Sequence, residues 1–497
     1  MGVIARQSIR GTIVTYLGVF VGFLTTFFVL TRFLTAEEIG LARVLIDTGT
    51  LFIGLAQLGT SSSIIRFFPY FKSAPITGAP AKHHGFFFWT VIIPLFGFAV
   101  IAFLYWLLHD SIAAVFAEKS ALFVHYYYAV LPLAFFMLYQ TIFETNANAL
   151  MNIVFPRAVR ELFLRLFLLA TYLLYAFRVV SMDGFIILLC SAYGLAALMN
   201  IIYLFVQGKI SLRPDFHFVS AQLARQYAFY TLFQITAAIA TVLAPFISSY
   251  YITATMGLEY TGIFAIASYI AAMISIPNRS LNAIANPQLA QTTKDGDHEG
   301  LSRLLRQVSN NSFLIGSFLL TAIWLNIDLI FLILPNGSTY AVARYVVLFL
   351  GLSQLTIATL NATISVLNFS KYYYLSLLFS LVLTVSAILF NNQLIPVLGM
   401  NGAALANLLS YLLYFALILA TVGLCLRLSP FCTGHLKTLA LTLLLFALGA
   451  LVDKYLPMPI LLSSALKTAA WALALLAAFY WRISPEINET VQAKLKS

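Results

Sequence analysis

The sequence predicts an all-α integral membrane protein with about fourteen transmembrane helices. Hydrophobic residues make up 61% of its 497 residues and charged residues only 9%, whereas a soluble domain carries about 25% charged residues. Long apolar runs recur along the whole chain, and the connections between them are short. A chain so poor in charge cannot cover itself with a surface that faces water, so its solvent is expected to be lipid.

The apolar runs set the expected spans, because a helix needs about 20 mostly apolar residues to cross a bilayer. The first run follows Arg6 and Arg10; it is long for the core of a signal peptide and no A-x-A site follows it, so we expect an uncleaved helix. The expected spans lie at about residues 11–32, 44–66, 86–108, 121–144, 160–180, 185–207, 227–252, 260–283, 311–334, 344–368, 372–391, 401–426, 437–452 and 460–481.

Basic residues predict the orientation. With these spans, 21 of the 28 Lys and Arg residues lie on the side of the membrane that holds both termini and the even-numbered connections, and 7 lie on the other side. Positive connections stay in the cytoplasm, so both termini are expected there and the helix count is expected to be even. The net charge of +11 is explained by this bias rather than by binding of nucleic acid. Two basic, amphipathic connections, Lys209–Arg225 and Gln291–Arg306, are expected to lie along the inner membrane surface.

A weak repeat relates the two halves of the chain. An acid and a glycine stand at Glu38 and Gly40 after the first span, and at Glu259 and Gly262 after the seventh. The offset predicts two parallel six-helix halves, between which transporters place substrate sites, although any turn between helices favours an acid and a glycine. We therefore expect an N-terminal lobe at 1–207, a cytoplasmic linker at 208–226, a C-terminal lobe at 227–426, and the last two helices with a cytoplasmic tail at 427–497.

Charged residues within the apolar runs are costly in lipid and are therefore candidate functional sites. As a set they lean cationic, and arginine binds phosphate through two hydrogen bonds, so a cavity that gathers them suits an anionic ligand. The candidates for substrate binding are Arg66, Arg279, Arg165, Arg160, Arg43 and Arg344, and those for ion coupling or ion pairing are Asp47 and Glu144.

Each candidate also has a plainer interpretation. Arg43 and Asp47 stand four residues apart, which suits a structural ion pair on one helix face. Arginines near helix ends are common positive flanks, whose side chains reach the headgroups at small cost.

Several chemistries have no motif in this sequence. It has no phosphate-binding glycine loop, and its seven His residues lack the spacing of metal ligands. Cys190, Cys425 and Cys432 form no redox or metal pair. We therefore expect no catalytic residues, no cofactor and no metal.

Five segments carry a resemblance to a known family. They are RFLTAEEIG at 32–40, LAQLGT at 55–60, IIRFF at 64–68, NPQLA at 286–290 and LIPVLGMNGAALA at 394–406. Together with the uncharged first helix, they resemble the polysaccharide transporters, which are lipid-linked oligosaccharide flippases of the O-antigen type. These belong to the multidrug/oligosaccharidyl-lipid/polysaccharide exporter superfamily, as does the lipid II flippase.

The resemblance implies two six-helix bundles in a V plus two C-terminal helices, in the cell inner membrane. It implies that a polyprenyl-pyrophosphate-linked oligosaccharide is flipped from the cytoplasmic to the outer leaflet by alternating access. Arg66 and Arg279 would stand at the cytoplasmic mouths of a cationic cavity, and the last two helices would form a groove for the lipid tail. Implied partners are membrane lipids, a polysaccharide polymerase and glycosyltransferases.

Two other functions stay open. A cation-coupled exporter of small molecules would use H⁺ or Na⁺, with Asp47 or Glu144 as the coupling acid, but the first helix lacks the acid that multidrug members often carry. A polytopic glycan-assembly enzyme is expected to show a sizeable outer loop, whereas the longest outer segments, near 107–122 and 335–344, are short.

Overall fold

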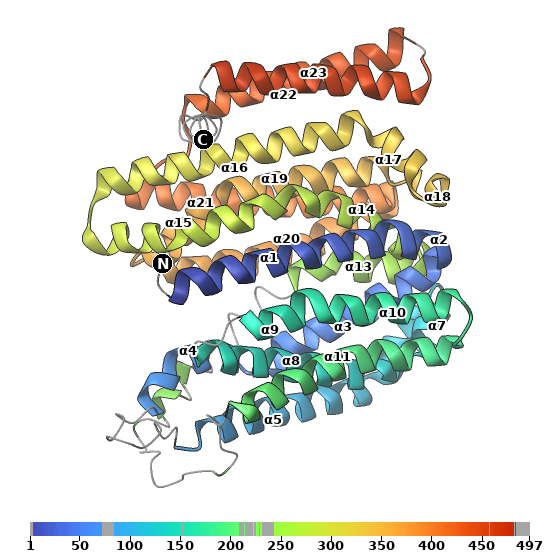
Figure 1. Ribbon diagram of the computed structural model, residues 1–497, viewed down its shortest axis with the longest axis vertical. Coiled ribbons are helices and arrows are strands. Elements are labelled where there is room, and N and C mark those ends of the chain that lie inside the picture. Colours follow the sequence, from blue (N-terminus) through green and yellow to red (C-terminus); the bar gives the residue numbers. More distant parts are fainter. Residues whose placement is uncertain are drawn as a thin grey trace. The chain divides into compact units, whose positions relative to one another are not determined.

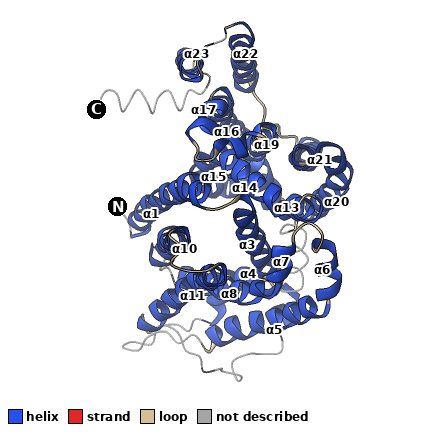
Figure 2. Ribbon diagram, turned by 90° about the vertical axis from the view of Figure 1, so that its right-hand side faces the viewer, coloured by secondary structure: helices blue, strands red, loops and turns tan. Residues whose placement is uncertain are grey.

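The computed structural model describes residues 3–71, 84–150, 154–207, 243–456 and 458–481, with isolated positions between 213 and 230 and Ile483. All regular structure in this described part is helical (Figures 1 and 2), which confirms the predicted fold class. By length and composition, 11 of the described helices can cross a membrane. The fourth and fifth predicted spans correspond to α8 (Val130–Ala149) and α10 (Leu164–Ala176), and most of the seventh lies outside the described residues.

The chain divides into two compact units, Met1–Gly262 and Ile263–Ser497. The predicted linker at 208–226 falls where the structure describes only isolated positions, and the division into lobes stays a prediction. The first unit contains α1 (Val3–Leu24), a π-helix η1 (Thr25–Leu30), α2 (Thr31–Phe33), α3 (Ala36–Ala56), α4 (Thr60–Phe71), α5 (Phe86–Leu107), α6 (His109–Phe116), α7 (Ala121–His125), η2 (Tyr127–Ala129), α8, α9 (Val154–Ala158), a second π-helix η3 (Val159–Phe163), α10, α11 (Met182–Val206) and α13 (Ala244–Thr255).

The helices of the second unit are mostly long. Helix α14 (Leu258–Ala272) begins in the first unit and continues into the second. The others are η4 (Met273–Ser275), α15 (Ile276–Asp295), α16 (His298–Leu325), α17 (Ile327–Ile333), α18 (Gly337–Ala341), α19 (Arg344–Phe369), α20 (Tyr373–Leu398), α21 (Met400–Leu426), α22 (Thr433–Tyr455) and α23 (Ile460–Tyr480).

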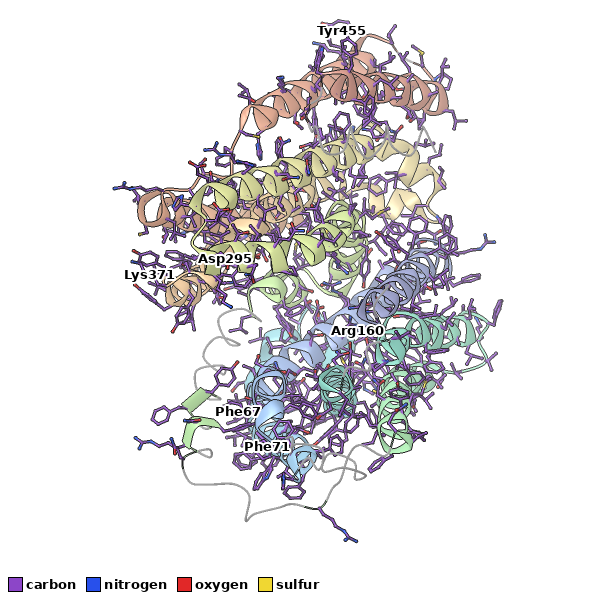
Figure 3. The ribbon with its side chains drawn as sticks, turned by 60° about the vertical axis from the view of Figure 1, so that its left-hand side comes forward. Phe67, Phe71, Arg160, Asp295, Lys371 and Tyr455 are labelled. Carbon is purple, nitrogen blue, oxygen red and sulfur yellow. The ribbon has the colours of Figure 1, made fainter. Side chains whose placement is uncertain are left out.

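The core of the first unit is aromatic. Helices α3, α4, α5, α8 and α11 enclose buried rings that include Phe67, Phe71, Phe86 and Phe143, and the first two are labelled in Figure 3. On α5 the outward rings are large and apolar: Phe96 is 68% exposed. Such a surface is stable against lipid rather than water, in keeping with a multi-pass membrane protein.

The last two helices form a hairpin that packs on α16 (Figure 1). Trp471 of α23 donates a hydrogen bond to the Phe318 carbonyl at 2.9 Å, and Asn310 donates one to the Ile483 carbonyl at 3.0 Å. Lys467, which is 5% exposed, pairs with Asp453 of α22 and neutralises a charge that would otherwise be stranded among apolar groups.

Both boundaries of the second predicted span are wrong. The predicted span 44–66 is two helices, α3 and α4, separated by a turn in which Leu58 and Gly59 have φ of 46° and 67°. Helix α3 also starts earlier than its apolar run, because Thr35 and Glu38 form a capping box whose two hydrogen bonds measure 2.8 and 3.2 Å.

The predicted basic connection Gln291–Arg306 lies at the ends of two long helices. It contains the end of α15 and the start of α16, joined by a two-residue turn. Gly296, at φ +70°, ends the first helix, and Asp297 caps the second by accepting from the Gly300 N–H at 2.9 Å. The other such segment, Lys209–Arg225, lies almost entirely outside the described residues.

Candidate functional site

The largest group of interacting charges in the described part of the chain lies in the first unit, where α8 meets η3 and α10. Arg160 contacts Glu144 of α8 at 2.7 Å and Glu161 at 3.1 Å. Arg165 contacts the other oxygen of Glu161 at 3.1 Å. The sequence predicted Arg160, Arg165 and Glu144 as separate candidates, and the structure brings them together.

The cluster is asymmetric in its exposure. The Glu144 and Glu161 side chains are 9% and 14% exposed, whereas those of Arg160 and Arg165 are 47% and 28% exposed. The carboxylates therefore lie behind the guanidinium groups. Such an arrangement presents fixed N–H donors to an anion that approaches from the open side.

Local backbone geometry places these side chains. Residues 159–163 form a π-helix between α9 and α10, an irregularity that is often found at functional sites. Glu161 sits in this segment and, four residues before Arg165, lies on the same face. Because this segment is wider than an α-helix, a neighbouring helix needs small residues at the contact in order to pack closely against it.

Helix α1 presents two such small residues, Gly18 and Gly22, to this segment and the start of α10. A Cβ at Gly18 would overlap the backbone oxygen of Glu161, and a Cβ at Gly22 would lie 2.9 Å from Nη1 of Arg165. Gly18 thus lets the backbones of α1 and η3 come into contact, and Gly22 leaves room for the Arg165 side chain. The G-x-x-x-G spacing of Gly18 and Gly22 is the sequence signal from which this contact could have been predicted.

Arg43 and Asp47 form the predicted i, i+4 pair on α3, with Nε and Oδ2 2.8 Å apart. Asp47 is 3% exposed and also accepts a hydrogen bond from Ser249 of α13. Next to it, Tyr250 donates to Thr48 at 3.0 Å. The pair therefore belongs to the contact between α3 and α13 and not to the arginine cluster.

The remaining candidates lie elsewhere. Arg344 of α19 pairs with Asp328 of α17 at 3.1 Å and stacks over the Trp324 ring at 5.1 Å, near one end of the second unit. Arg279 is exposed on α15 and forms no ion pair with the described residues. Arg66 lies on α4, and its side chain is outside the described part.

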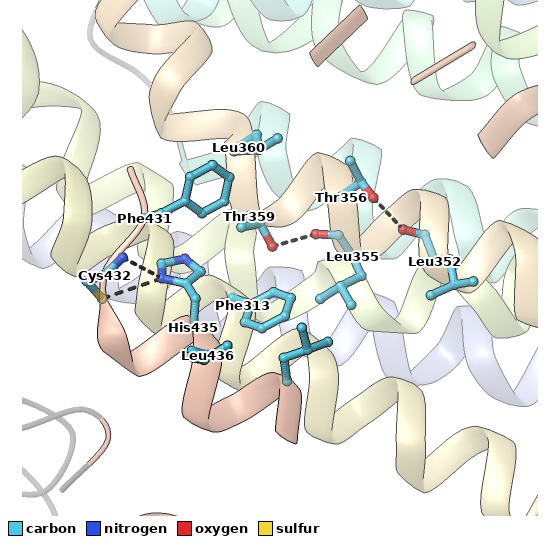
Figure 4. Close-up of a pocket in the computed structure, with 11 residues that line it drawn as sticks. Phe313, Leu352, Leu355, Thr356, Thr359, Leu360, Phe431, Cys432, His435 and Leu436 are labelled. Atoms are coloured by element: carbon cyan, nitrogen blue, oxygen red, sulfur yellow. Dashed lines mark hydrogen bonds between the residues drawn. The ribbon is translucent and has the colours of Figure 1, made fainter. Parts of the chain in front are cut away.

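A cavity of about 430 Å³ opens in the second unit between α16, α19 and the start of α22 (Figure 4). Its polar groups are already engaged. Thr356 and Thr359 donate to carbonyls of their own helix at 2.8 and 2.7 Å, and His435 contacts the Cys432 N–H at 3.2 Å and Ser309 at 3.1 Å. The cavity therefore suits an apolar occupant.

Metal chemistry has no site in the part of the chain that the structure describes, because no three His, Cys, Asp or Glu residues gather there.

Comparison by sequence identifies no relative: neither a family model nor a curated protein matches this chain. Comparison by structure does.

The lipid II flippase MurJ in an inward closed conformation superposes with a TM-score of 0.72 at 10% identity, covering 95% of this chain and 99% of that one. The chain has the fold of MurJ and the MATE transporters. An inward-facing multidrug resistance MATE transporter of the MOP superfamily gives 0.58 at 15% identity, covering 82% and 96%. A MOP superfamily transporter from Pyrococcus furiosus gives 0.55 at 14% identity, covering 84% and 95%.

The comparison confirms the fold of the predicted superfamily and leaves the substrate to be proposed. All three structures are described as transporters or flippases, and their fold is in line with the prediction of a multi-pass membrane protein.

Proposed function

We propose that the protein flips a polyprenyl-pyrophosphate-linked oligosaccharide from the cytoplasmic to the outer leaflet of the cell inner membrane, by alternating access. The product would enter assembly of a cell-surface polysaccharide such as an O-antigen or lipopolysaccharide, whose polymerase and glycosyltransferases are the proposed partners. Both termini are proposed to be cytoplasmic.

The main support for this proposal is the arginine cluster, which consists of Arg160, Arg165, Glu144 and Glu161. Arg160 and Arg165 are partly exposed within helices that are otherwise mostly apolar. A charge exposed to acyl chains is costly, so these groups are better placed beside a polar space. A pyrophosphate or an acidic sugar offers both the negative charge and the paired oxygens that a guanidinium fork binds.

The apolar cavity supports the lipid part of the substrate. The family resemblance implied a tail groove formed by the last two helices. The residues that line the cavity come from α16, α19 and the start of α22, and none comes from α23. Leu436 of α22 is 71% exposed at its edge. Burying each methylene of a polyprenyl chain there contributes about 0.8 kcal/mol.

A second candidate function is a cation-coupled small-molecule exporter. The buried acid Asp47 could bind the coupling cation that such an exporter needs. Its carboxylate is held by Arg43 and Ser249 in this conformation, so a coupling cation such as H⁺ or Na⁺ would have to displace these partners. We therefore keep Asp47 and Glu144 as proposed coupling residues and place the exporter second.

Deleting the gene and analysing the lipid-linked glycans tests the proposal directly. We expect one polyprenyl-pyrophosphate glycan to accumulate on the cytoplasmic leaflet. Proteoliposomes that contain the purified protein and the accumulated lipid should then move it across the bilayer. An unchanged lipid pool and immobile lipid in the proteoliposomes would refute the proposed function.

Replacing Arg66 or Arg279 by alanine is expected to reduce surface glycan while the protein still inserts. The reason is the loss of a positive charge at each predicted cytoplasmic mouth. Glycan staining of intact cells, normalised to membrane-inserted protein, measures the effect. Normal glycan from both variants would remove these two positions from the cationic cavity.

The turn between α15 and α16 is expected to face the cytoplasm. A cysteine introduced at the exposed Glu299, in a variant without Cys190, Cys425 and Cys432, should resist a membrane-impermeant maleimide in intact cells and react after lysis. The expectation rests on the excess of basic residues on that side. Labelling in intact cells would reverse the orientation.

A further inference from the structure

The four charges of the cluster compensate one another. Arg160 and Arg165 carry two positive charges, and Glu144 and Glu161 carry two negative ones. In this conformation the guanidinium groups already have carboxylate partners, so an incoming anion must compete with a carboxylate of the protein itself.

The two carboxylates differ in how they are attached. Glu161 lies in the same helical segment as Arg160 and Arg165, so it moves with them. Glu144 comes from α8, and its contact with Arg160 joins two separate helices. The contact between Glu144 and Arg160 breaks when α8 shifts relative to η3. The contacts of Glu161 with Arg160 and Arg165 persist through such a shift.

Position and chemistry together make Glu144 a substitute for a substrate group. It reaches Nη1 of Arg160 from the buried side at 2.7 Å, the distance of a charge-assisted hydrogen bond. A carboxylate oxygen and a phosphate oxygen place the same demands on a guanidinium donor. The open side of Arg160, which is 47% exposed, is left for the competitor.

We propose that Glu144 is an internal counter-anion, which neutralises Arg160 in the empty transporter and yields it to the anionic group of the substrate. This inference rests on the proposed function and identifies the residue that tunes its anion site. Glu144 makes binding weaker, because each substrate must replace it, and makes release faster, because it reclaims Arg160. It is a positioning residue and does not touch the substrate.

Glu144→Gln tests the idea, since it keeps the size of the side chain and a carbonyl acceptor but removes the charge. The probe is inorganic pyrophosphate, titrated into the full-length protein in nanodiscs and followed by calorimetry. We expect the Kd to fall at least about tenfold, and to return to the wild-type value or above it in the double variant Glu144→Gln, Arg160→Gln. Glu299→Gln, an equal change of charge at an exposed site of α16, is the control.

A transport assay in proteoliposomes separates this role from a purely structural one. Glu144→Gln should lower KM and lower kcat together, because the anion is held more tightly and released more slowly. Glu144→Asp keeps the negative charge but moves it away from Arg160, because the side chain is one methylene shorter. This variant should tighten pyrophosphate binding by a smaller factor than Glu144→Gln. It serves as the test variant if Glu144→Gln does not fold. A Kd equal to or weaker than that of the wild type would overturn the inference.

The two proposals can fail separately. Pyrophosphate binding is measured without any lipid-linked glycan, so a Glu144 effect can be found even if no glycan is flipped. Conversely, flipping by the wild type with an unchanged Kd in both Glu144 variants would leave the proposed function standing and remove the internal counter-anion.

Discussion

Replacing Arg160 and Arg165 together by glutamine is expected to reduce flipping of the lipid-linked glycan by roughly a hundredfold or more. A hydrogen bond to a charged group contributes about 1.5–3 kcal/mol, and every 1.4 kcal/mol is a factor of ten. The double variant loses two such donors. Initial rates in proteoliposomes, at equal protein content, measure the loss.

The matched control removes two positive charges elsewhere. Lys294→Gln with Arg303→Gln changes exposed residues at the ends of α15 and α16 and should leave the rate within about twofold. If the two double variants slow transport equally, net charge rather than the cluster determines the rate. Stability must also be followed, because Glu144 loses its partner at a cost between about 1 kcal/mol for an exposed pair and about 3–5 kcal/mol for a buried one.

Replacing Gly40 by valine is expected to have the largest effect on stability. Within the first unit, a Cβ at Gly40 would overlap the backbone oxygen of Leu258, and a Cβ at Gly262 would overlap that of Ala36. The obstacle at each position is main chain, which cannot rotate away as a side chain can. Overpacking typically costs about 1–3 kcal/mol, and we expect Tm in detergent to fall by at least about 5 °C.

Gly423 is the control for this prediction. It lies in α21, and a Cβ added there would meet no atom within 4 Å, so the same substitution should leave Tm nearly unchanged. Helix propensity cannot explain a loss at either position, because valine is a better helix former than glycine. Equal losses at Gly40 and Gly423 would therefore show that the close approach to Leu258 is not the cause.

Hydropathy located the helices well where apolar sequence and helix coincide. The predicted spans 86–108, 344–368 and 401–426 agree with α5, α19 and α21 to within about one residue. It failed where a helix begins outside its apolar run. A capping box starts α3 at Ala36, eight residues before the apolar run suggested, and no hydropathy scale records such a signal.

The sequence was enough to predict which charged residues belong to the site, but not which of them contact one another across helices. Arg160, Glu161 and Arg165 stood out because charges are rare in these runs, and the pair of Glu161 with Arg165 follows from helical spacing. The contact between Glu144 and Arg160 depends on how α8 is rotated against η3. That rotation is set by packing between helices that are distant in sequence, and no local pattern encodes it.

The glycine contact also bears on ancestry. Gly40 meets Leu258, four residues before Gly262, while Gly262 meets Ala36, four residues before Gly40. Such an exchange of partners characterises the interface of a twofold homodimer, in which one residue acts on both sides. If the two halves descend from one duplicated gene, a single ancestral glycine made both contacts, and any change there was felt twice. Fusion into one chain has since let the two positions evolve independently.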